Sequence, residues 1–269
     1  MCKTLEKPLT NCILGVHVAV TSMEEVLELI LGRLKEVRGQ YICFSNVHTT
    51  VMARESEAYR RIQNSAFLAL PDGGPLALVQ RLRGFKGAKK VSGPDAMPAL
   101  WKATENMEVK HYFYGSSQRT IEALAKKLKV QYPGLKIAGM ESPPFRPLTK
   151  QEDQEAVRRI NASGADILWV GLGAPKQEEW MYAHRDKVNA LMLGVGAGFD
   201  FHAGVVKRAP EWMQKHYLEW LYRLFQDPAR LWKRYAVTNF KFVCFSIQDS
   251  FLWKRRGKQK GFLTDKEEG

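Results

Sequence analysis

Asp72 is the residue of this chain whose type and setting best suit general-base chemistry. It lies in the run Leu70-Pro71-Asp72-Gly73-Gly74-Pro75, directly after an apolar segment that is predicted to be a strand. Glycines at such a place let the backbone approach a ligand, and a carboxylate there can accept the proton of an attacking hydroxyl group. The alternative is that Asp72 caps a helix starting near Pro75, and the two roles are compatible.

Asn46 follows another apolar run, Tyr41–Ser45, and offers both a donor and an acceptor to sugar hydroxyl groups. Its neighbours His48 and Thr49 open a predicted helix, so capping that helix is the other use of this side chain. His48 has no visible carboxylate partner, and a structural role is favoured for it. The sequence is thus compatible with two roles for Asn46, which are binding of a sugar and capping of the following helix.

A glycine-rich turn joins a predicted strand to a predicted helix at residues 170–180, Val-Gly-Leu-Gly-Ala-Pro-Lys-Gln-Glu-Glu-Trp. Backbone N–H groups at such a turn, including that of Gly173, can face a diphosphate at the start of the helix. Lys176 or Gln177 can then reach the donor, which stabilises a leaving nucleotide without requiring a metal ion. The alternative is a tight turn that binds no ligand.

The run 194–200, Gly-Val-Gly-Ala-Gly-Phe-Asp, repeats this arrangement one strand later. Gly196 lies in the turn, and Asp200 can accept a hydrogen bond from a base N–H or a ribose hydroxyl group. Neither run is a dinucleotide fingerprint, because the third glycine of G-x-G-x-x-G would fall at Lys176 in the first run and at Phe199 in the second. A nicotinamide-dependent oxidoreductase is therefore disfavoured.

The elements that must position these residues alternate short apolar runs with amphipathic stretches through the first two hundred residues. This alternation predicts an α/β fold, Rossmann-like, with helices flanking a largely parallel sheet. Ligands of such sheets collect at the carboxyl ends of the strands. The predicted strands cover residues 41–45, 67–70, 111–114, 135–138, 166–170 and 191–195, with a hairpin over 13–20 and a first helix over 23–34.

The pattern changes beyond residue 205. Residues 211–225 and 228–245 are predicted to be helices rich in Trp, Tyr, Phe and Leu, with interleaved Arg and Lys. The segment 236–253 is too polar and too short to span a membrane, so it is interpreted as a helix in the membrane interface or as part of a helix pair packed on the core. The predicted domains are an α/β domain at 1–205, a basic, Trp-rich helical appendage at 206–260 and a frayed tail at 261–269.

The net charge of +13 points to anionic partners, and its distribution selects among them. Between Lys207 and Lys260, thirteen Lys and Arg stand against four Asp and Glu, so +9 of the charge belongs to this segment. A basic segment with several Trp suits an anionic membrane surface. No nucleic-acid-binding motif is recognisable, and the charge is concentrated outside the α/β body, so nucleic-acid binding is disfavoured.

The four cysteines form no CxxC pair and no cluster with His at ligand spacing, so neither a zinc site nor a disulfide framework is predicted. No segment at the start has the pattern of a signal peptide, and we expect the protein in the cytoplasm. We expect no metal and no cofactor, and a homo-oligomer stays open.

Several runs of the chain form a combination that is specific when taken together. They are Asp72-Gly73, the run Val-Ser-Gly-Pro-Asp at 91–95, the runs 171–178 and 194–200, the run Lys-Arg-Ala-Pro-Glu-Trp at 207–212, and the runs 219–223 and 228–235. This combination resembles the WecG/TagA/CpsF glycosyltransferase family, and the likeness spans nearly the whole chain.

The resemblance implies an inverting, metal-independent transfer from a UDP-sugar to an undecaprenyl-diphosphate-linked N-acetylglucosamine. The donor sugar of the best-known members is N-acetylmannosamine, and wall teichoic acid, enterobacterial common antigen and capsule pathways use such transfers. A lipid-linked acceptor places the enzyme at the periphery of the inner face of the cell membrane, and no cofactor is implied.

By the same resemblance Asp72 is the catalytic base with Asn46 beside it, Asn46 and Gln177 line the sugar and diphosphate site, and Asp200 faces the nucleotide. The remaining substrate-binding positions that we assign to the α/β body are Ser45, Lys90, Ser92, Gly93, Asp95, Gly173, Lys176 and Gly196.

Arginines of the family's C-terminal appendage are thought to close over the active site at the membrane. Arg223 and Arg230 stand at matching places, and Arg234 or Lys233 is a third. Arginine suits this task because its planar fork of donors matches a diphosphate.

One departure from the family concerns the donor sugar. Members often have Thr two residues before the Asn, where this chain has Phe44. Ser45 is the nearest hydroxyl group, but in an extended strand its side chain should point to the opposite face. N-acetylmannosamine is thus the first interpretation of the donor, and another UDP-sugar, such as UDP-glucose or a UDP-ManNAc uronic acid, is the alternative.

Overall fold

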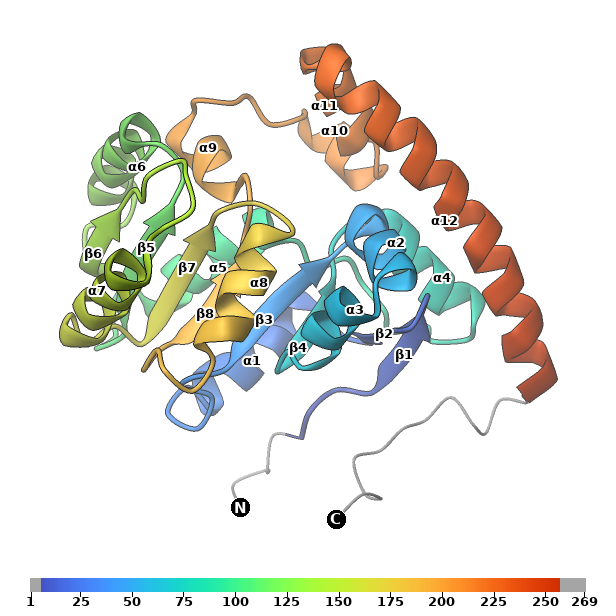
Figure 1. The fold of residues 1–269 in the computed structure, drawn as a ribbon, viewed down its shortest axis with the longest axis horizontal. Coiled ribbons are helices and arrows are strands. Elements are labelled where there is room, and N and C mark those ends of the chain that lie inside the picture. Colours follow the sequence, from blue (N-terminus) through green and yellow to red (C-terminus); the bar gives the residue numbers. More distant parts are fainter. Residues whose placement is uncertain (1–5, 257–269) are drawn as a thin grey trace. The chain divides into compact units, whose positions relative to one another are not determined.

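The computed structural model describes residues 6–256, without the side chains of residues 230, 234 and 251–256. Its elements group into two compact units made of interleaved segments (Figure 1). The first unit contains residues 24–43 and 92–207, and the second contains residues 6–23, 44–91 and 208–256. This division rests on compactness, so the predicted domains 1–205 and 206–260 stay predictions, and residues 261–269 lie outside the described part.

The first unit alternates strands and helices along the chain. Its elements are α1 (Met23–Gly32), β3 (Tyr41–Ser45, which the unit includes as far as Cys43), α5 (Gly93–Thr104), β5 (Lys110–Gly115), α6 (Gln118–Gln131), β6 (Lys136–Glu141), α7 (Lys150–Ala162), β7 (Ile167–Gly171), α8 (Lys176–His184), β8 (Leu191–Gly194) and α9 (Gly198–Ala203). The strands pair in parallel in the order β3, β8, β7, β5, β6.

Helices cover both faces of this parallel sheet, as the neighbouring residues Phe113 and Tyr114 of β5 show. Side chains alternate between the faces of a strand. The Phe113 ring lies 6.0 Å from that of Trp101 on α5, while the Tyr114 ring lies 5.1 Å from that of Trp180 on α8. Strands covered on both sides are apolar throughout, which explains why they appear in the sequence as short unbroken apolar runs.

The second unit combines a hairpin with helices from both ends of the described chain. Its elements are β1 (Thr10–Ile13), β2 (Val16–Ala19), α2 (Val47–Glu55), α3 (Glu57–Asn64), β4 (Leu68–Pro71), α4 (Gly74–Leu82), α10 (Glu211–Lys215), α11 (Glu219–Gln226) and α12 (Pro228–Arg256). β1 and β2 are antiparallel around a turn in which Leu14 and Gly15 have positive φ, and β2 pairs with β4 in parallel.

The predicted α/β class with a largely parallel sheet is confirmed. Each predicted strand overlaps an observed one to within a few residues, and the predicted hairpin and first helix are present. The prediction of a single helix over 211–225 is wrong, because that stretch forms α10 and α11. The break lies at Tyr217, whose φ of 61° is left-handed.

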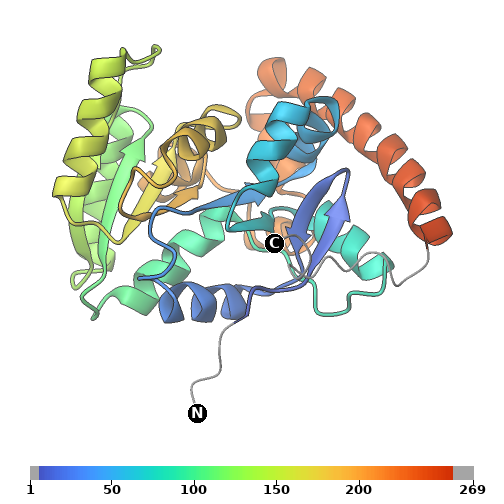
Figure 2. The ribbon, with the colours of Figure 1, turned by 60° about the horizontal axis from the view of Figure 1, so that its bottom comes forward.

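The long helix α12 lies alongside α2 (Figures 1 and 2). Phe242 is buried in the same apolar cluster as Val51 of α2, and Lys241 forms an ion pair with Glu55. Farther along, Asp249 accepts hydrogen bonds from the Leu14 N–H group at 3.2 Å and from Arg83 at 3.1 Å. One side of α12 therefore packs on the rest of the second unit, and the interpretation of this segment as a helix in the membrane interface stays a prediction. Within residues 6–256 no helix is long and apolar enough to cross a membrane.

A buried histidine, His111, is fully paired inside the first unit. Its Nδ1 accepts from the Trp169 indole N–H at 3.1 Å, and its Nε2 lies 2.9 Å from the Thr104 hydroxyl oxygen. Because that hydroxyl group donates to the Leu100 carbonyl at 2.6 Å, the Nε2–H must donate to it. Both ring nitrogens are used by the neutral imidazole, and burial lowers the pKa of His111 from 6.5 to about 4.

This burial predicts a loss of stability in mild acid. Between pH 6.5 and 4 the unfolded chain binds a proton on His111 that the folded protein does not, so the free energy of unfolding falls as the pH falls. The His111 contribution to this fall is about 2–3 kcal/mol between pH 7.5 and 4.5.

Urea unfolding at several pH values measures the effect. His111→Gln should lose less stability on acidification than the wild type, although it is less stable at pH 7.5. His216→Gln, which removes an exposed imidazole, is the control and should follow the wild-type curve. Parallel curves for His111→Gln and the wild type would contradict the assignment.

Candidate functional site

The second unit brings the loops that carry Asn46, Asp72 and Lys90 together. The Asp72 N–H group donates to the Ser45 carbonyl at 2.7 Å, and the Val91 N–H group donates to the Pro71 carbonyl at 2.9 Å. Residues 45–46, 71–74 and 89–91 are therefore neighbours through their backbones. This is the grouping that the carboxyl ends of β3 and β4 predict.

Asp72 precedes α4 without capping it. The N-cap residue is Gly73, with φ 103° and ψ 154°, and no side chain caps this helix. The alternative in which Asp72 serves as the helix cap is therefore wrong. Gly73 takes a conformation that other residues rarely adopt, so the glycine sets the direction in which the chain leaves β4.

Asn46 caps α2 in a reciprocal capping box with Thr49. Its Oδ1 accepts from the backbone N–H groups of His48 at 3.0 Å and Thr49 at 3.1 Å, while Thr49 Oγ1 accepts from the Asn46 N–H group at 2.8 Å. The acceptor that the sequence offered to a sugar is thus committed to the helix. A ligand can still meet the amide nitrogen as a donor.

The Ser45 side chain, which we assigned to substrate binding, points into the core of the protein. The residue is buried, and its hydroxyl group donates to Gln63 Oε1 at 2.6 Å, while Gln63 in turn donates to the Tyr59 hydroxyl group at 3.0 Å. The Ser45 side chain therefore belongs to the core, and only its carbonyl group takes part in the loop cluster. Phe44 is also buried.

Lys90 belongs to a small charged cluster built around Glu219. Lys90 Nζ lies 3.7 Å from Glu219 Oε2, and Arg208 Nε donates to Glu219 Oε1 at 3.1 Å. Glu219 is the first residue of α11, the helix that also carries the half-buried Arg223. The side chains of the other predicted arginines, Arg230 and Arg234, lie outside the described part.

In the first unit, the Gln177 side chain ties the ends of two strands together. Its Oε1 accepts from the N–H groups of Gly173 at 3.2 Å and Gly196 at 2.9 Å, and its Nε2 donates to the Gly194 carbonyl at 3.0 Å and to Glu178 at 2.8 Å. Gln177 is 4% exposed. The structure therefore uses this residue to hold the two glycine turns, where the sequence predicted a direct ligand contact.

Both glycine turns need glycine at their tips. Gly173 and Gly196 have φ of 77° and 55°, and a side chain built on Gly173 would meet only open space. The next residues begin α8, which no side chain caps, and Lys176 at its start is exposed. An open turn followed by an uncapped helix start is suited to bind an anion.

Asp200 is held by residues that the sequence analysis missed. Its Oδ1 accepts from the hydroxyl groups of Ser116 at 2.9 Å and Thr120 at 3.0 Å. Ser116 follows Gly115 at the end of β5 and has a left-handed φ of 59°. The signal was present in the run Tyr-Gly-Ser-Ser at 114–117, which directly follows a predicted strand.

The predicted group of Ser92, Gly93 and Asp95 forms the start of α5. The Ser92 hydroxyl group accepts from the Asp95 N–H at 3.3 Å and donates to the Asp95 carboxylate at 2.5 Å, and Gly93 is the buried first residue of the helix. In the structure these residues fix where α5 begins. Their predicted contact with substrate stays a prediction.

The Cys43 thiol supplies no nucleophile to the first unit. Burial raises its pKa well above 9.0, and the carboxylate of Glu178 raises it further. A protonated thiol is a poor nucleophile. In the part of the chain that is described, no group of three or more His, Cys, Asp and Glu could hold a metal ion.

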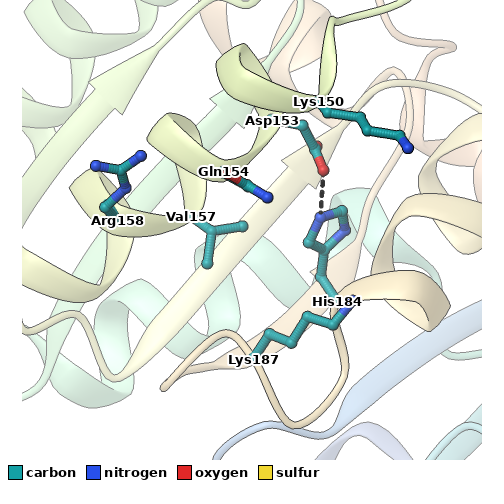
Figure 3. Close-up of a pocket in the computed structure, with 7 residues that line it drawn as sticks. All are labelled: Lys150, Asp153, Gln154, Val157, Arg158, His184 and Lys187. Atoms are coloured by element: carbon teal, nitrogen blue, oxygen red, sulfur yellow. Dashed lines mark hydrogen bonds and ion pairs between the residues drawn. The ribbon is translucent and has the colours of Figure 1, made fainter.

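An open pocket of about 430 Å³ lies elsewhere, between α7 and α8 (Figure 3). Its lining residues are Lys150, Asp153, Gln154, Val157, Arg158, His184 and Lys187. Asp153 joins the helices, because it accepts from Trp180 at 3.0 Å and pairs with His184 at 2.8 Å. His184 ends α8, about 12 Å along the helix axis from Lys176. None of the predicted site residues lines this pocket.

Parallel strands that end in tight glycine turns before helix N-termini are typical of α/β enzymes that act on phosphorylated ligands. Comparison with known proteins narrows this class. The model of the Glycosyl transferase WecG/TagA/CpsF family matches residues 11–257, and the chain belongs to this family. The resemblance drawn from the sequence runs is thereby confirmed.

Curated relatives from several bacteria match most of the chain. A Bacillus spizizenii (strain W23) protein is 31% identical over 202 residues, which cover 75% of this chain and 76% of the relative. A Bacillus subtilis (strain 168) protein is 30% identical, covering 76% and 80%, and a Staphylococcus aureus (strain MW2) protein is 30% identical, covering 86% and 90%. Each relative is named N-acetylglucosaminyldiphosphoundecaprenol N-acetyl-beta-D-mannosaminyltransferase.

The Gln177 contacts predict that this side chain stabilises the glycine turns. Gln177→Leu keeps the size of the side chain but leaves the N–H groups of Gly173 and Gly196 without their acceptor, which should lower the free energy of unfolding by about 2–3 kcal/mol. Urea unfolding measures the change.

The control is Gln118→Leu, which removes one exposed hydrogen bond to Glu122 in the same unit. This change should cost less than about 0.5 kcal/mol. Equal stabilities of the two variants would show that the Gln177 contacts contribute little.

Proposed function

We propose that this protein transfers N-acetylmannosamine from a UDP-sugar to the N-acetylglucosamine of an undecaprenyl-diphosphate-linked acceptor, with inversion and without a metal ion. The observation that carries this proposal is the shared name of the relatives, each matched over at least 76% of its own length. Family membership over residues 11–257 supports the same reaction class.

In the proposed reaction, a hydroxyl oxygen of the acceptor sugar attacks the anomeric carbon of the donor. The bond from that carbon to the UDP oxygen breaks from the opposite side, which inverts the configuration, and Asp72 takes the hydroxyl proton. Asp72 suits this task because its carboxylate directly follows β4, at the strand end where ligands of such sheets collect. The Asn46 amide nitrogen is the donor that we assign to the sugar beside it.

The leaving UDP carries additional negative charge, and several groups of the chain suit it. We assign the uncapped starts of the helices that follow the Gly173 and Gly196 turns, with Lys176, to the diphosphate of the donor. In the second unit, Lys90 and Arg223 are the cations that we assign to anionic groups of the substrates. Asp200, with one oxygen oriented by Ser116 and Thr120, is assigned to the nucleoside.

A different UDP-sugar is the second candidate donor, and a specific residue favours it. Phe44 is buried and apolar at the position where the family resemblance implies Thr, so this position offers no hydroxyl group to orient the sugar. UDP-glucose and a UDP-ManNAc uronic acid are the alternatives to test.

The proposed base predicts a large loss of turnover on Asp72→Asn. This change keeps the shape of the side chain and removes the proton acceptor, so kcat should fall by about 10² to 10⁴ while KM for the donor changes little. UDP release, measured with a short-chain N-acetylglucosamine-diphosphate-lipid and a panel of UDP-sugars, reports both values.

Asp186→Asn is the matched control, because Asp186 is exposed and its left-handed φ of 63° also suits Asn. Its turnover should equal that of the wild type. A wild type that is inactive with every donor would reject the proposed function, and an active Asp72→Asn would reject the base.

We also propose that α12 docks on the anionic inner face of the membrane. Trp232, Ala236, Phe240, Val243 and Ile247 follow one another at intervals of four, four, three and four residues and are all exposed, so they form an apolar stripe. Phe240 is 72% exposed and Ile247 is 53% exposed. The stripe lies opposite the side of α12 that contains buried Leu231, Thr238 and Phe242.

This stripe predicts membrane binding that a charge at its centre should weaken. Phe240→Glu should lower partitioning onto phosphatidylglycerol vesicles at least tenfold, because it removes an inserted ring and adds a repelled charge. Co-sedimentation with the vesicles measures this.

Gln248→Glu adds the same charge at an exposed polar position of α12 and should reduce binding far less. Equal partitioning of Phe240→Glu and the wild type would mean that another surface meets the lipid.

A further inference from the structure

The turn between α10 and α11 contains a tyrosine in a backbone position that normally favours glycine. The Leu218 N–H group donates to the Met213 carbonyl at 2.8 Å, and the Tyr217 N–H group donates to the Gln214 carbonyl at 3.2 Å. These paired bonds define a Schellman motif, in which the left-handed residue after the helix is usually Gly. Tyr217 takes this place with φ 61°, so its backbone is strained.

The ring of this tyrosine lies directly against Gly74. A Cβ atom built on Gly74 would stand 2.2 Å from Tyr217 Cγ and 2.5 Å from Tyr217 Cβ, so no other residue fits beneath the ring. The Arg81 guanidinium carbon lies 6.0 Å from the ring centroid. Gly74 and Arg81 share one face of α4, two turns apart, and the ring therefore lies along the start of this helix.

The same turn also holds the neighbouring loop. Glu219, two residues after Tyr217, contacts Lys90 at 3.7 Å and Arg208 at 3.1 Å. Residues 89–91 in turn join Pro71 through the Val91 N–H group. The turn at 216–219 thus contacts Gly74 through the Tyr217 ring and Lys90 through the Glu219 carboxylate, and the loop that contains Lys90 bonds to Pro71.

We propose that Tyr217 is a positioning residue for the reaction. Its ring fixes the Asp72 loop in the conformation in which the Asp72 carboxylate takes the proton from the hydroxyl group of the acceptor sugar. This inference rests on the proposed function of Asp72 as base. A strained backbone persists where surrounding contacts over-determine it, and such strain concentrates at functional sites. Here the strain places the ring on the residue two positions after the base.

The loop needs such a restraint because of its own sequence. Gly73 and Gly74 follow Asp72 in succession, and two glycines give the backbone more freedom than any other pair of residues. A misplacement of about 1 Å in a catalytic group can reduce a rate by about 10². Loss of the ring should therefore reduce kcat and leave the KM for the UDP-sugar nearly unchanged.

Tyr217→Gly is the variant that separates positioning from stability. Glycine relieves the left-handed backbone, so the melting temperature should stay the same or rise, while kcat should fall at least tenfold. A residue with a purely structural role would show a lower melting temperature together with the lower kcat. Wild-type kcat in Tyr217→Gly would overturn the proposal.

Two further variants test whether the ring is the acting group. Tyr217→Phe keeps the ring and should recover most of the turnover that Tyr217→Gly loses. His216→Gly adds the same backbone freedom one residue earlier, at an exposed position, and should keep wild-type turnover. If Tyr217→Phe is as slow as Tyr217→Gly, the ring contact is not the cause.

The partner side of the contact gives a second, independent test. Gly74→Ala places a methyl group where the ring lies, so it should also reduce kcat. Combined with Tyr217→Gly it should reduce kcat no further than the slower single variant, because both changes break one contact. Multiplying losses in the double variant would contradict the shared contact.

Hydrogen exchange of the backbone amides of residues 72–74 gives a measure that does not depend on activity. These amides should exchange at least tenfold faster in Tyr217→Gly than in the wild type. If the wild type transfers no sugar, the proposed function fails whatever the exchange shows. If it transfers sugar and the exchange is unchanged, only the role of Tyr217 fails.

Discussion

The separation of the two glycine turns in the first unit depends on one side chain. Gln177 accepts from the amides after β7 and β8 and donates to the Gly194 carbonyl, so both strand ends are fixed from within the protein. Tight turns expose backbone N–H groups that must find partners, and a buried amide side chain satisfies two of them at once. The helices α8 and α9 begin directly after these turns, so the same hydrogen bonds also fix the distance between the starts of the two helices.

In the second unit, the ring of Tyr217 restrains a glycine-rich loop, as the amide of Gln177 does in the first unit. The loop at Asp72 is rich in glycine, and its restraint comes from a turn more than 140 residues later in the sequence. Glu219 extends the restraint to Lys90, and α12 follows within the same segment. The residues between 208 and 256 are therefore part of the unit's core on one side, while the other side of α12 remains available to a lipid surface.

Local patterns predicted the elements well and the contacts poorly. The strand ends at Asp72, Gly173 and Gly196 could be placed because apolar runs and glycines are local signals. The hydrogen-bond partners of Ser45 and Gln177 could not, because Gln63 and Gly194 are distant in the sequence and no local pattern identifies them. The break at Tyr217 was missed for a similar reason, since only tertiary packing makes tyrosine acceptable at a glycine position.

Because the second unit is made of segments far apart in the sequence, it cannot fold early during synthesis on the ribosome. The hydrogen bond from Leu14 to Asp249 joins residues 235 positions apart, and Phe242 completes a core that begins at Ile13. On the ribosome, the hairpin and the Asp72 loop emerge long before the helices that cover them. This unit therefore cannot close before residues 242–249 have been synthesised, so the apolar surface of the hairpin stays uncovered until then.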